Sequence, residues 1–302
     1  MMNSVVDIEP QNLQDCWTLL YFSTARKLTE FYGQEGKRLI RRAVHRYGSE
    51  VGALERKAHV EKRIGTSLKS FYELPVIRYD DPRFRLDVQR LDEQEALFDV
   101  VTCPFREMVR FRGPAFFRNV EEGRELALCF CEEFTYACIE AYTEGVGQAN
   151  LSEILDRRGE NSCRFADYLR PANMNEEQVR AFEGDAARKD GIKPETAPNA
   201  SVRWNRLAAM LVAAFNAVCD EERGDARRAV AEGLRLAARE IAAFMAERAD
   251  AVGAPLTAAF VSQNCPLHSG AGSNDPALEE FIGVNFRAPL GLWVEQNVGR
   301  KE

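Results

Sequence analysis

Apolar side chains recur every three or four residues over the first sixty positions, which is the spacing of one buried face of an α-helix. The first helical stretch begins at Asn12 and pauses near Gly33, where this spacing is interrupted. A second helix is expected to stop at Gly48, because glycine commonly occupies the position that follows a helix. Residues 50–63 are more polar and predict a third helix.

The pattern then changes to an alternation of apolar and polar residues, which is typical of a strand with one buried face. Residues 84–88 and 97–101 predict a β-hairpin around the polar segment 92–95. Cys103 follows the second strand, and Pro104 should end the pairing because proline has no backbone N–H to donate.

Helical spacing returns over residues 121–142, after which residues 151–155 and 162–169 predict a second hairpin. Residues 173–201 lose this periodicity and collect proline and glycine between charged residues. That composition predicts a linker, with one short helix starting at Asn175.

Two alanine-rich stretches beyond the linker, residues 202–220 and 225–252, predict an antiparallel pair of helices. The expected fold class is therefore α+β. Residues 1–172 should form one domain of N-terminal helices and a small antiparallel sheet. The linker over residues 173–201 should then lead into a mostly helical C-terminal part, residues 202–302.

The chain has 302 residues and a formal net charge of −7, which argues against the clustered basic surface that binds nucleic acid. No apolar stretch reaches 18 residues, and Asp7 and Glu9 stand where a signal peptide would be basic. We therefore expect a cytoplasmic protein without a membrane or nucleic-acid partner. Its eight cysteines should then stay reduced, as core residues, metal ligands or nucleophiles.

Thiols, carboxylates and guanidinium groups gather between residues 102 and 172. The candidate catalytic residues are Cys103, Glu107, Cys131, Glu133 and Cys163, and the candidate substrate-binding residues are Arg106 and Arg110. A neighbouring cation lowers the pKa of a thiol whereas burial raises it, and the sequence leaves this balance open. Arginine suits a substrate carboxylate because it can donate two parallel hydrogen bonds. The alternative interpretation is a buried core with a charged rim and solvated arginines on a loop.

The helix expected over residues 121–142 carries three cysteines. Cys129 and Cys131 are about 200° apart around the helix axis, so only one of them can face a given site. Cys138 lies about 10 Å beyond Cys131 along the axis, too far for both to bind one metal directly. We therefore expect Cys131 to be the cysteine of this helix that faces any shared site.

Histidines offer little further chemistry. Cys265 and His268 form a C-x-x-H pair with two atoms of the kinds that bind zinc, but no second pair of ligands lies nearby in the sequence. His45 and His59 lie on expected helices without an evident partner, so we interpret both as surface or packing residues.

Four short motifs occur in order along residues 28–172. They are E-F-Y-G-x-E-G at residues 30–36, C-P-F at 103–105, C-x-E at 131–133 and S-C-R-F at 162–165. Together they resemble the L-2-amino-thiazoline-4-carboxylic acid hydrolase family. The resemblance implies a hydrolase that opens the cyclic amidine ring of aminothiazoline carboxylate to N-carbamoyl-cysteine, a step of cysteine biosynthesis.

On this interpretation the enzyme acts on a non-peptide C–N bond of a small cyclic amidine or amide that bears a carboxylate. Water or a cysteine thiolate would attack the amidine carbon, and Glu107 or Glu133 would accept or donate the proton. Arg106 would hold the substrate carboxylate.

A weaker likeness connects residues 153–165 with the 4-vinyl reductase type of small-molecule-binding module, which carries E-x-x-C ahead of G-x-x-x-C-R-F. It implies a divalent metal such as zinc, bound by Glu153, Asp156 and Cys163. Asp156 stands where that module has its middle cysteine, and a carboxylate is still a zinc ligand.

A second function stays open at this point. The same pocket could capture a small heterocycle without turnover, as a sensor-like binding module that signals through the helical C-terminal part. No DNA-binding or ATPase motif, which would favour this alternative, is found in the sequence. The expected partners are a small molecule and a second copy of the chain, bound through the C-terminal helices.

Overall fold

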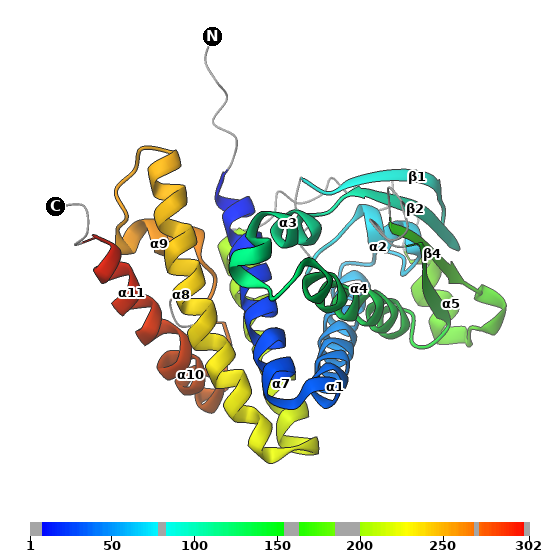
Figure 1. Ribbon diagram of the computed structural model, residues 1–302. Helices are drawn as coiled ribbons and strands as arrows, with labels where there is room; N and C mark the ends of the chain where they lie inside the picture. Colours follow the sequence, from blue (N-terminus) through cyan, green and yellow to red (C-terminus); the bar gives the residue numbers. More distant parts are fainter. Residues whose placement is uncertain (1–7, 78–82, 154–162, 185–199, 269–271, 299–302) are drawn as a thin grey trace, which may run out of the picture. The chain divides into compact units, whose positions relative to one another are not determined.

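A computed structural model gives the fold of the chain (Figure 1). It describes residues 8–77, 83–153, 163–184, 200–268 and 272–298. Within these ranges helices predominate around one four-stranded antiparallel sheet, which confirms the predicted α+β class. None of the described helices combines the length and the apolar character needed to cross a bilayer.

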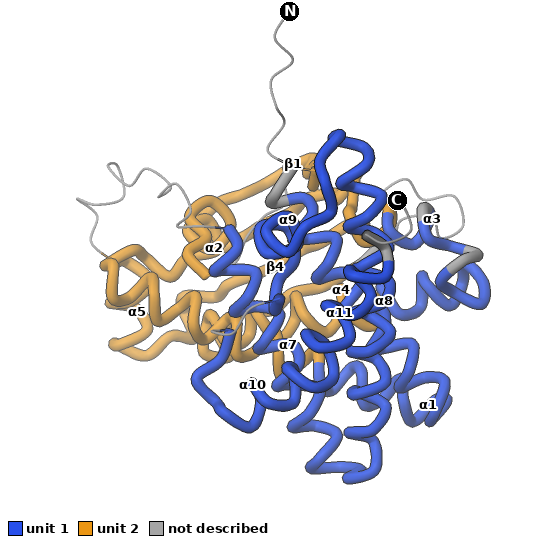
Figure 2. Tube along the Cα trace, turned by 90° about the vertical axis from the view of Figure 1, so that its left-hand side faces the viewer, with its two compact units in different colours: residues 1–43, 108–127, 199–302 blue, residues 44–107, 128–198 orange. Residues whose placement is uncertain are grey.

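The contacts of the chain divide it into two compact units (Figure 2). Unit 1 comprises residues 1–43, 108–127 and 199–302, and unit 2 comprises residues 44–107 and 128–198. Each unit therefore combines segments that are far apart in the sequence. This division differs from the contiguous domains expected to either side of residues 173–201, because three helices contribute residues to both units.

The first of these helices, α1 (Ile8–Glu61), leaves helical geometry at Gly33, whose φ of 56° and ψ of −124° bend the chain sharply. The predicted pause at this position is confirmed. Glycine adopts a positive φ at little cost because it has no Cβ, which explains why the bend falls here.

Unit 1 contains the predicted antiparallel pair, α7 (Ala200–Glu222) and α8 (Arg227–Ala251), joined by the short η2 (Gly224–Ala226). One face of α8 is buried, and it consists of Val230, Leu234, Ala237, Ile241 and Met245.

The tail of unit 1, from residue 253, is mostly helical, which confirms the predicted helical C-terminal part. It contains α9 (Ala258–Asn264), α10 (Pro276–Ile282), the π-helix η3 (Gly283–Arg287) and α11 (Ala288–Val298). The first two are only seven residues long and begin at side-chain caps, Thr257 and Asp275. Such short helices owe little to periodicity and much to capping and packing, and α11 packs against α8 (Figure 1).

In unit 2, the second half of α1 packs closely against α4 (Val120–Tyr142). The prediction that a helix ends at Gly48 is wrong, since α1 continues to Glu61. A Cβ at Gly48 would lie 2.8 Å from the carbonyl oxygen of Phe134. Glycine at this position therefore permits close approach of two helices instead of ending one.

The sheet of unit 2 has the strand order β1-β2-β4-β3. Its strands are β1 (Arg85–Leu91), β2 (Glu95–Thr102), β3 (Gly147–Glu153) and β4 (Cys163–Leu169). Antiparallel pairing of β1 with β2 and of β3 with β4 confirms both predicted hairpins. The pairing of β2 with β4 places Val100 opposite Cys163 and Phe98 opposite Phe165, so these four side chains share one face.

Three further helices complete the described chain of this region: α2 (Leu68–Glu73), α3 (Pro104–Phe116) and α5 (Glu176–Glu183), with a 3₁₀ turn, η1 (Pro171–Asn173), before α5. The short helix expected at Asn175 is confirmed, because Asn175 and Gln178 form a reciprocal capping box at its start. The loop interpretation of Arg106 and Arg110 is wrong, since both lie on α3.

Candidate functional site

Three cysteines from three elements of unit 2 lie close enough for their thiols to interact. Cys103 connects β2 to α3, Cys131 lies on α4, and Cys163 begins β4; all three are half-buried. Burial raises the pKa of the Cys131 thiol well above its usual value, and the thiols of Cys103 and Cys163 raise it further. The structure thus brings these three predicted site residues together, and we call them the thiol cluster.

Cys103 lies at the N-terminal end of α3, where its sulfur accepts hydrogen bonds from the backbone N–H groups of Arg106 and Phe105. Its carbonyl oxygen also accepts the N–H of Glu107, at 3.1 Å. Burial nevertheless raises the pKa of the Cys103 thiol to about 11, and the helix N–H groups and the Arg106 guanidinium lower it by less. The thiol is therefore protonated at neutral pH.

Iodoacetamide labelling of Cys103 should accelerate about tenfold for each pH unit between pH 7 and pH 10, because only the thiolate reacts and its pKa lies near 11. An unperturbed cysteine levels off near its pKa of about 8.5. Mass spectrometry of the peptide that carries Cys103 measures the rate, with glutathione in the same reaction as a reference. A rate that levels off below pH 9 would contradict the assignment.

Strand alternation separates Cys163 from the arginine that follows it. Cys163 shares a face of the sheet with Phe165, whereas Arg164 points to the opposite face and pairs with Asp99 on β2. Two nitrogens of Arg164, Nε and Nη2, each lie 2.9 Å from a different Asp99 oxygen. The guanidinium group next to Cys163 in the chain is therefore turned away from its thiol, because successive strand side chains point to opposite faces.

Arg164→Ala should destabilise the protein by about 1 kcal/mol at neutral pH and leave any turnover within about threefold. The effect is small because the Arg164 side chain is 39% exposed, so that water screens the pair. Hydrogen bonds from Arg164 lower the pKa of the Asp99 carboxyl. The stability from this pair is thus present above the unfolded-state pKa near 4 and is lost as the pH falls through the lower folded-state value. Urea unfolding of both proteins at pH 7 and pH 3 measures it; an equal difference at both pH values would contradict this account.

Glu132, next to Cys131 in the chain, acts on the thiol cluster through its charge, and a catalytic role of Glu133 stays a prediction. Glu132 contributes to the raised pKa of Cys131, after burial and the other two thiols of the cluster. Glu133 lies instead 3.6 Å from Nδ1 of His45 on α1. Neighbouring helical residues are about 100° apart around the axis and next-but-one residues about 200° apart, so helix geometry alone favoured Glu132.

The α3 candidates occupy different environments. Arg106 is half-buried, and its charge lowers the pKa of the Cys103 thiol, so it lies near the thiol cluster. Glu107 is exposed on the next position of the helix. Arg110 is also exposed and belongs to unit 1, outside the unit that holds the thiols.

Phenylalanines flank the thiol cluster in sequence and in space. Phe105 stacks on Phe130 with ring centroids 5.0 Å apart, and these residues adjoin Cys103 and Cys131 in the chain. Phe98 stacks on Phe165 at 5.5 Å, on the sheet face that carries Cys163. These rings explain why burial is the first cause of the raised thiol pKa values. Phe105 and Phe165 belong to the C-P-F and S-C-R-F motifs and Phe130 precedes Cys131, whereas Phe98 joins them only through strand pairing.

The proposed metal ligands are only partly described. Asp156 lies outside the described residues. The backbone of Glu153 lies opposite that of Arg164 in the pairing of β3 with β4, and Cys163 belongs to the thiol cluster. Among residues that the structure describes, no group of three or more histidine, cysteine, aspartate or glutamate side chains is arranged to hold a metal ion. A zinc site at Glu153, Asp156 and Cys163 stays a prediction.

His59, interpreted above as a surface or packing residue, is fully buried in unit 2. Its Nδ1 lies 2.7 Å from the Tyr142 hydroxyl, and its Nε2 lies 2.9 Å from the Leu74 carbonyl oxygen and 3.3 Å from Glu55 Oε1. Glu55 in turn accepts the backbone N–H of Ile77 at 2.8 Å. This network fixes the chain after α2 to the end of α1, which is a structural role.

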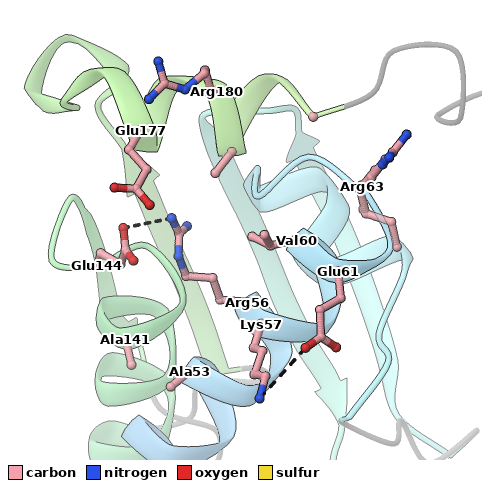
Figure 3. A pocket seen from close by; sticks show the side chains of 13 residues that line it. Ala53, Arg56, Lys57, Val60, Glu61, Arg63, Ala141, Glu144, Glu177 and Arg180 are labelled. Atoms are coloured by element: carbon pink, nitrogen blue, oxygen red, sulfur yellow. Dashed lines mark ion pairs between the residues drawn. The ribbon is translucent and has the colours of Figure 1, made fainter.

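A groove of about 870 Å³ opens elsewhere in unit 2, between the end of α1, the end of α4 and α5 (Figure 3). Arg56 in this groove pairs with Glu144 at 2.8 Å, and Lys57 lies 3.9 Å from Glu61. None of the predicted catalytic or substrate-binding residues lines it. Its charged side chains largely neutralise one another, so it offers no evident chemistry.

No protein-family model matches this chain, and no solved structure matches it. The resemblance to the aminothiazoline carboxylate hydrolases stays a prediction, based on four short motifs. Three of these motifs each contribute one residue to the thiol cluster: Cys103 from C-P-F, Cys131 from C-x-E and Cys163 from S-C-R-F.

Proposed function

We propose that the chain is a hydrolase that opens the ring of a small cyclic amidine or amide bearing a carboxylate. The thiol cluster would line its active site. The observation that supports this proposal is the meeting of Cys103, Cys131 and Cys163, which come from separate elements, beside a carboxylate and a guanidinium group. If these cysteines only filled the core, a carboxylate and a guanidinium group would not be expected beside them, because burying charged groups costs free energy.

The raised pKa values of the thiols favour water over a thiolate as the nucleophile. Cys103 and Cys131 are protonated at neutral pH, and a protonated thiol is a weak nucleophile but can donate a hydrogen bond or a proton. Glu132 is the carboxylate best placed to accept a proton from the attacking water. It takes the role first expected of Glu107 or Glu133.

Atom balance decides which ring bond breaks. Water adds its oxygen to the amidine carbon, one of its protons passes by way of the carboxylate to the amidine nitrogen, the other passes to the leaving atom, and the ring opens. An aminothiazoline that becomes N-carbamoyl-cysteine keeps its C–N bond, so the ring C–S bond breaks and the sulfur leaves as a thiol. The expected C–N cleavage therefore applies only to rings that are closed through nitrogen. In either case a protonated cysteine of the cluster can donate a proton to the leaving atom.

Arg106→Ala should raise KM for a carboxylate-bearing substrate by about 10- to 100-fold and change kcat by less than about threefold. A charge-assisted hydrogen bond contributes roughly 1.5–3 kcal/mol and would hold the substrate carboxylate equally in ground and transition states. Arg110→Ala, on the exposed surface of the same helix, should have a smaller effect. Steady-state kinetics of the three proteins measures this, and an unchanged KM in Arg106→Ala would remove Arg106 from the substrate site.

The experiment that tests the function is incubation of the purified protein, under reducing conditions, with a panel of carboxylate-bearing cyclic amidines that includes aminothiazoline carboxylate. Ring-opened product detected by mass spectrometry supports the proposal, and added zinc or chelator shows whether a metal takes part. Tight binding of one of these heterocycles by calorimetry, without product, would instead support a sensor-like binding module.

A further inference from the structure

A second pair of thiols is buried in unit 1, where the proposed hydrolase makes no use of it. Cys16 lies on the first half of α1 and Cys265 directly follows α9, and neither side chain has any exposed surface. The two thiols interact with each other, which contributes to the raised pKa of the Cys16 thiol. Cys16 Sγ also lies 3.6 Å from the carbonyl oxygen of Asn264, and Cys265 Sγ donates to the carbonyl oxygen of Pro266 at 3.2 Å.

The backbone around both thiols is fixed by neighbouring hydrogen bonds. One turn before Cys16, Asn12 Nδ2 donates to Asn264 Oδ1 at 2.6 Å, and Arg248 Nε donates to Asn12 Oδ1 at 2.9 Å. Asn264 Nδ2 donates to the Phe260 carbonyl oxygen at 2.8 Å. The start of α1 and the end of α9 are thus held together next to the two cysteines.

We propose that Cys16 and Cys265 are a modification site at which a peroxide, or a low-molecular-weight disulfide, closes a disulfide bond. The two thiols act on each other electrostatically, and Cys16 Sγ lies 3.6 Å from the backbone of the residue that precedes Cys265, so a bond of about 2.05 Å needs only a local approach. With hydrogen peroxide, one thiolate attacks the O–O bond and becomes a sulfenic acid, and hydroxide leaves. The second thiol then displaces the sulfenic oxygen, so two thiols and one peroxide give one disulfide and two water molecules.

Burial controls the rate of this reaction. An oxidant reaches the sulfurs only when unit 1 opens locally, so oxidation should be slow in buffer and faster in mild urea. Burial also raises the pKa of the Cys16 thiol, which slows attack further at neutral pH. Once closed, the bond links segments near opposite ends of the chain and should raise the thermal unfolding midpoint, because it restricts the unfolded chain.

The test is peptide mapping of the full chain after incubation with hydrogen peroxide in mild urea, blocking of free thiols, and digestion without reductant. We expect a peptide pair linked through Cys16 and Cys265, a higher unfolding midpoint, and reversal of both by dithiothreitol. The pair should be lost in Cys16→Ser and in Cys265→Ser but kept in Cys219→Ser, the matched control at another buried cysteine of unit 1.

Wild-type protein in which both cysteines are recovered unlinked, or linked to other cysteines, would overturn the proposal even if a serine variant failed to fold. So would an oxidised protein with an unchanged or lower unfolding midpoint. Both readouts are independent of turnover, so failure of the proposed hydrolase function would not affect them.

Discussion

Cys103→Ala is expected to lower kcat by roughly 100-fold or more, the usual contribution of a group that donates or accepts a proton in the transition state. The free energy of unfolding should fall by only about 1 kcal/mol, because the side chain is small and half-buried. Steady-state kinetics and urea unfolding of the same preparation measure the two effects separately.

The matched control for this change is Cys129→Ala. Cys129 is buried on α4, two residues before Cys131 and about 200° away around the helix axis, so the two side chains point to different faces of the helix. We expect it to reduce stability at least as much as Cys103→Ala without a comparable loss of turnover. Equal losses of kcat in both variants would show that the thiols act through packing alone.

Gly52→Ala should destabilise the protein by about 3 kcal/mol, although alanine is the better helix former. A Cβ at Gly52 would collide with the backbone carbonyl of Cys138 on α4, and neither backbone can move without separating the two helices. Because Cys131 lies two turns before Cys138, any separation should also disturb the thiol cluster and reduce turnover. Chemical denaturation of wild type and variant measures the change.

The control for Gly52 is Gly291→Ala, on the exposed surface of α11, where an added Cβ meets no atom within 4 Å. There the substitution should stabilise the protein by roughly 0.5–1 kcal/mol, the usual helical preference for alanine. A stabilising Gly52→Ala would contradict the close packing of α1 on α4.

Elements with a strong period were predictable from the sequence, as both hairpins and the α7–α8 pair show. The failures share one physical cause, which is that long-range contacts decide local structure. Gly48 looks like a helix end until α4 is known to pack on it. The short helices α9 and α10 are stabilised by caps and packing, which leave little periodic signal.

The candidate site followed the same rule. The meeting of Cys103, Cys131 and Cys163 could be anticipated, because Cys103 and Cys163 lie at strand ends and Cys131 lies on the helix between the two hairpins. The positions of the charged neighbours could not be anticipated, because residues that are adjacent in the chain can point in different directions. Strand alternation turns Arg164 to Asp99, and on α4 the charge of Glu132 acts on Cys131 whereas Glu133 lies near His45.

The most direct test of the central claim is protection of the thiol cluster by substrate. Each cysteine is labelled with iodoacetamide at pH 9, with and without a saturating cyclic amidine that the protein turns over, and the labelled peptides are quantified by mass spectrometry. The account predicts that labelling of Cys103, Cys131 and Cys163 slows together while that of Cys219, in unit 1, is unchanged. Turnover of the substrate with no protection at any of the three thiols would contradict it.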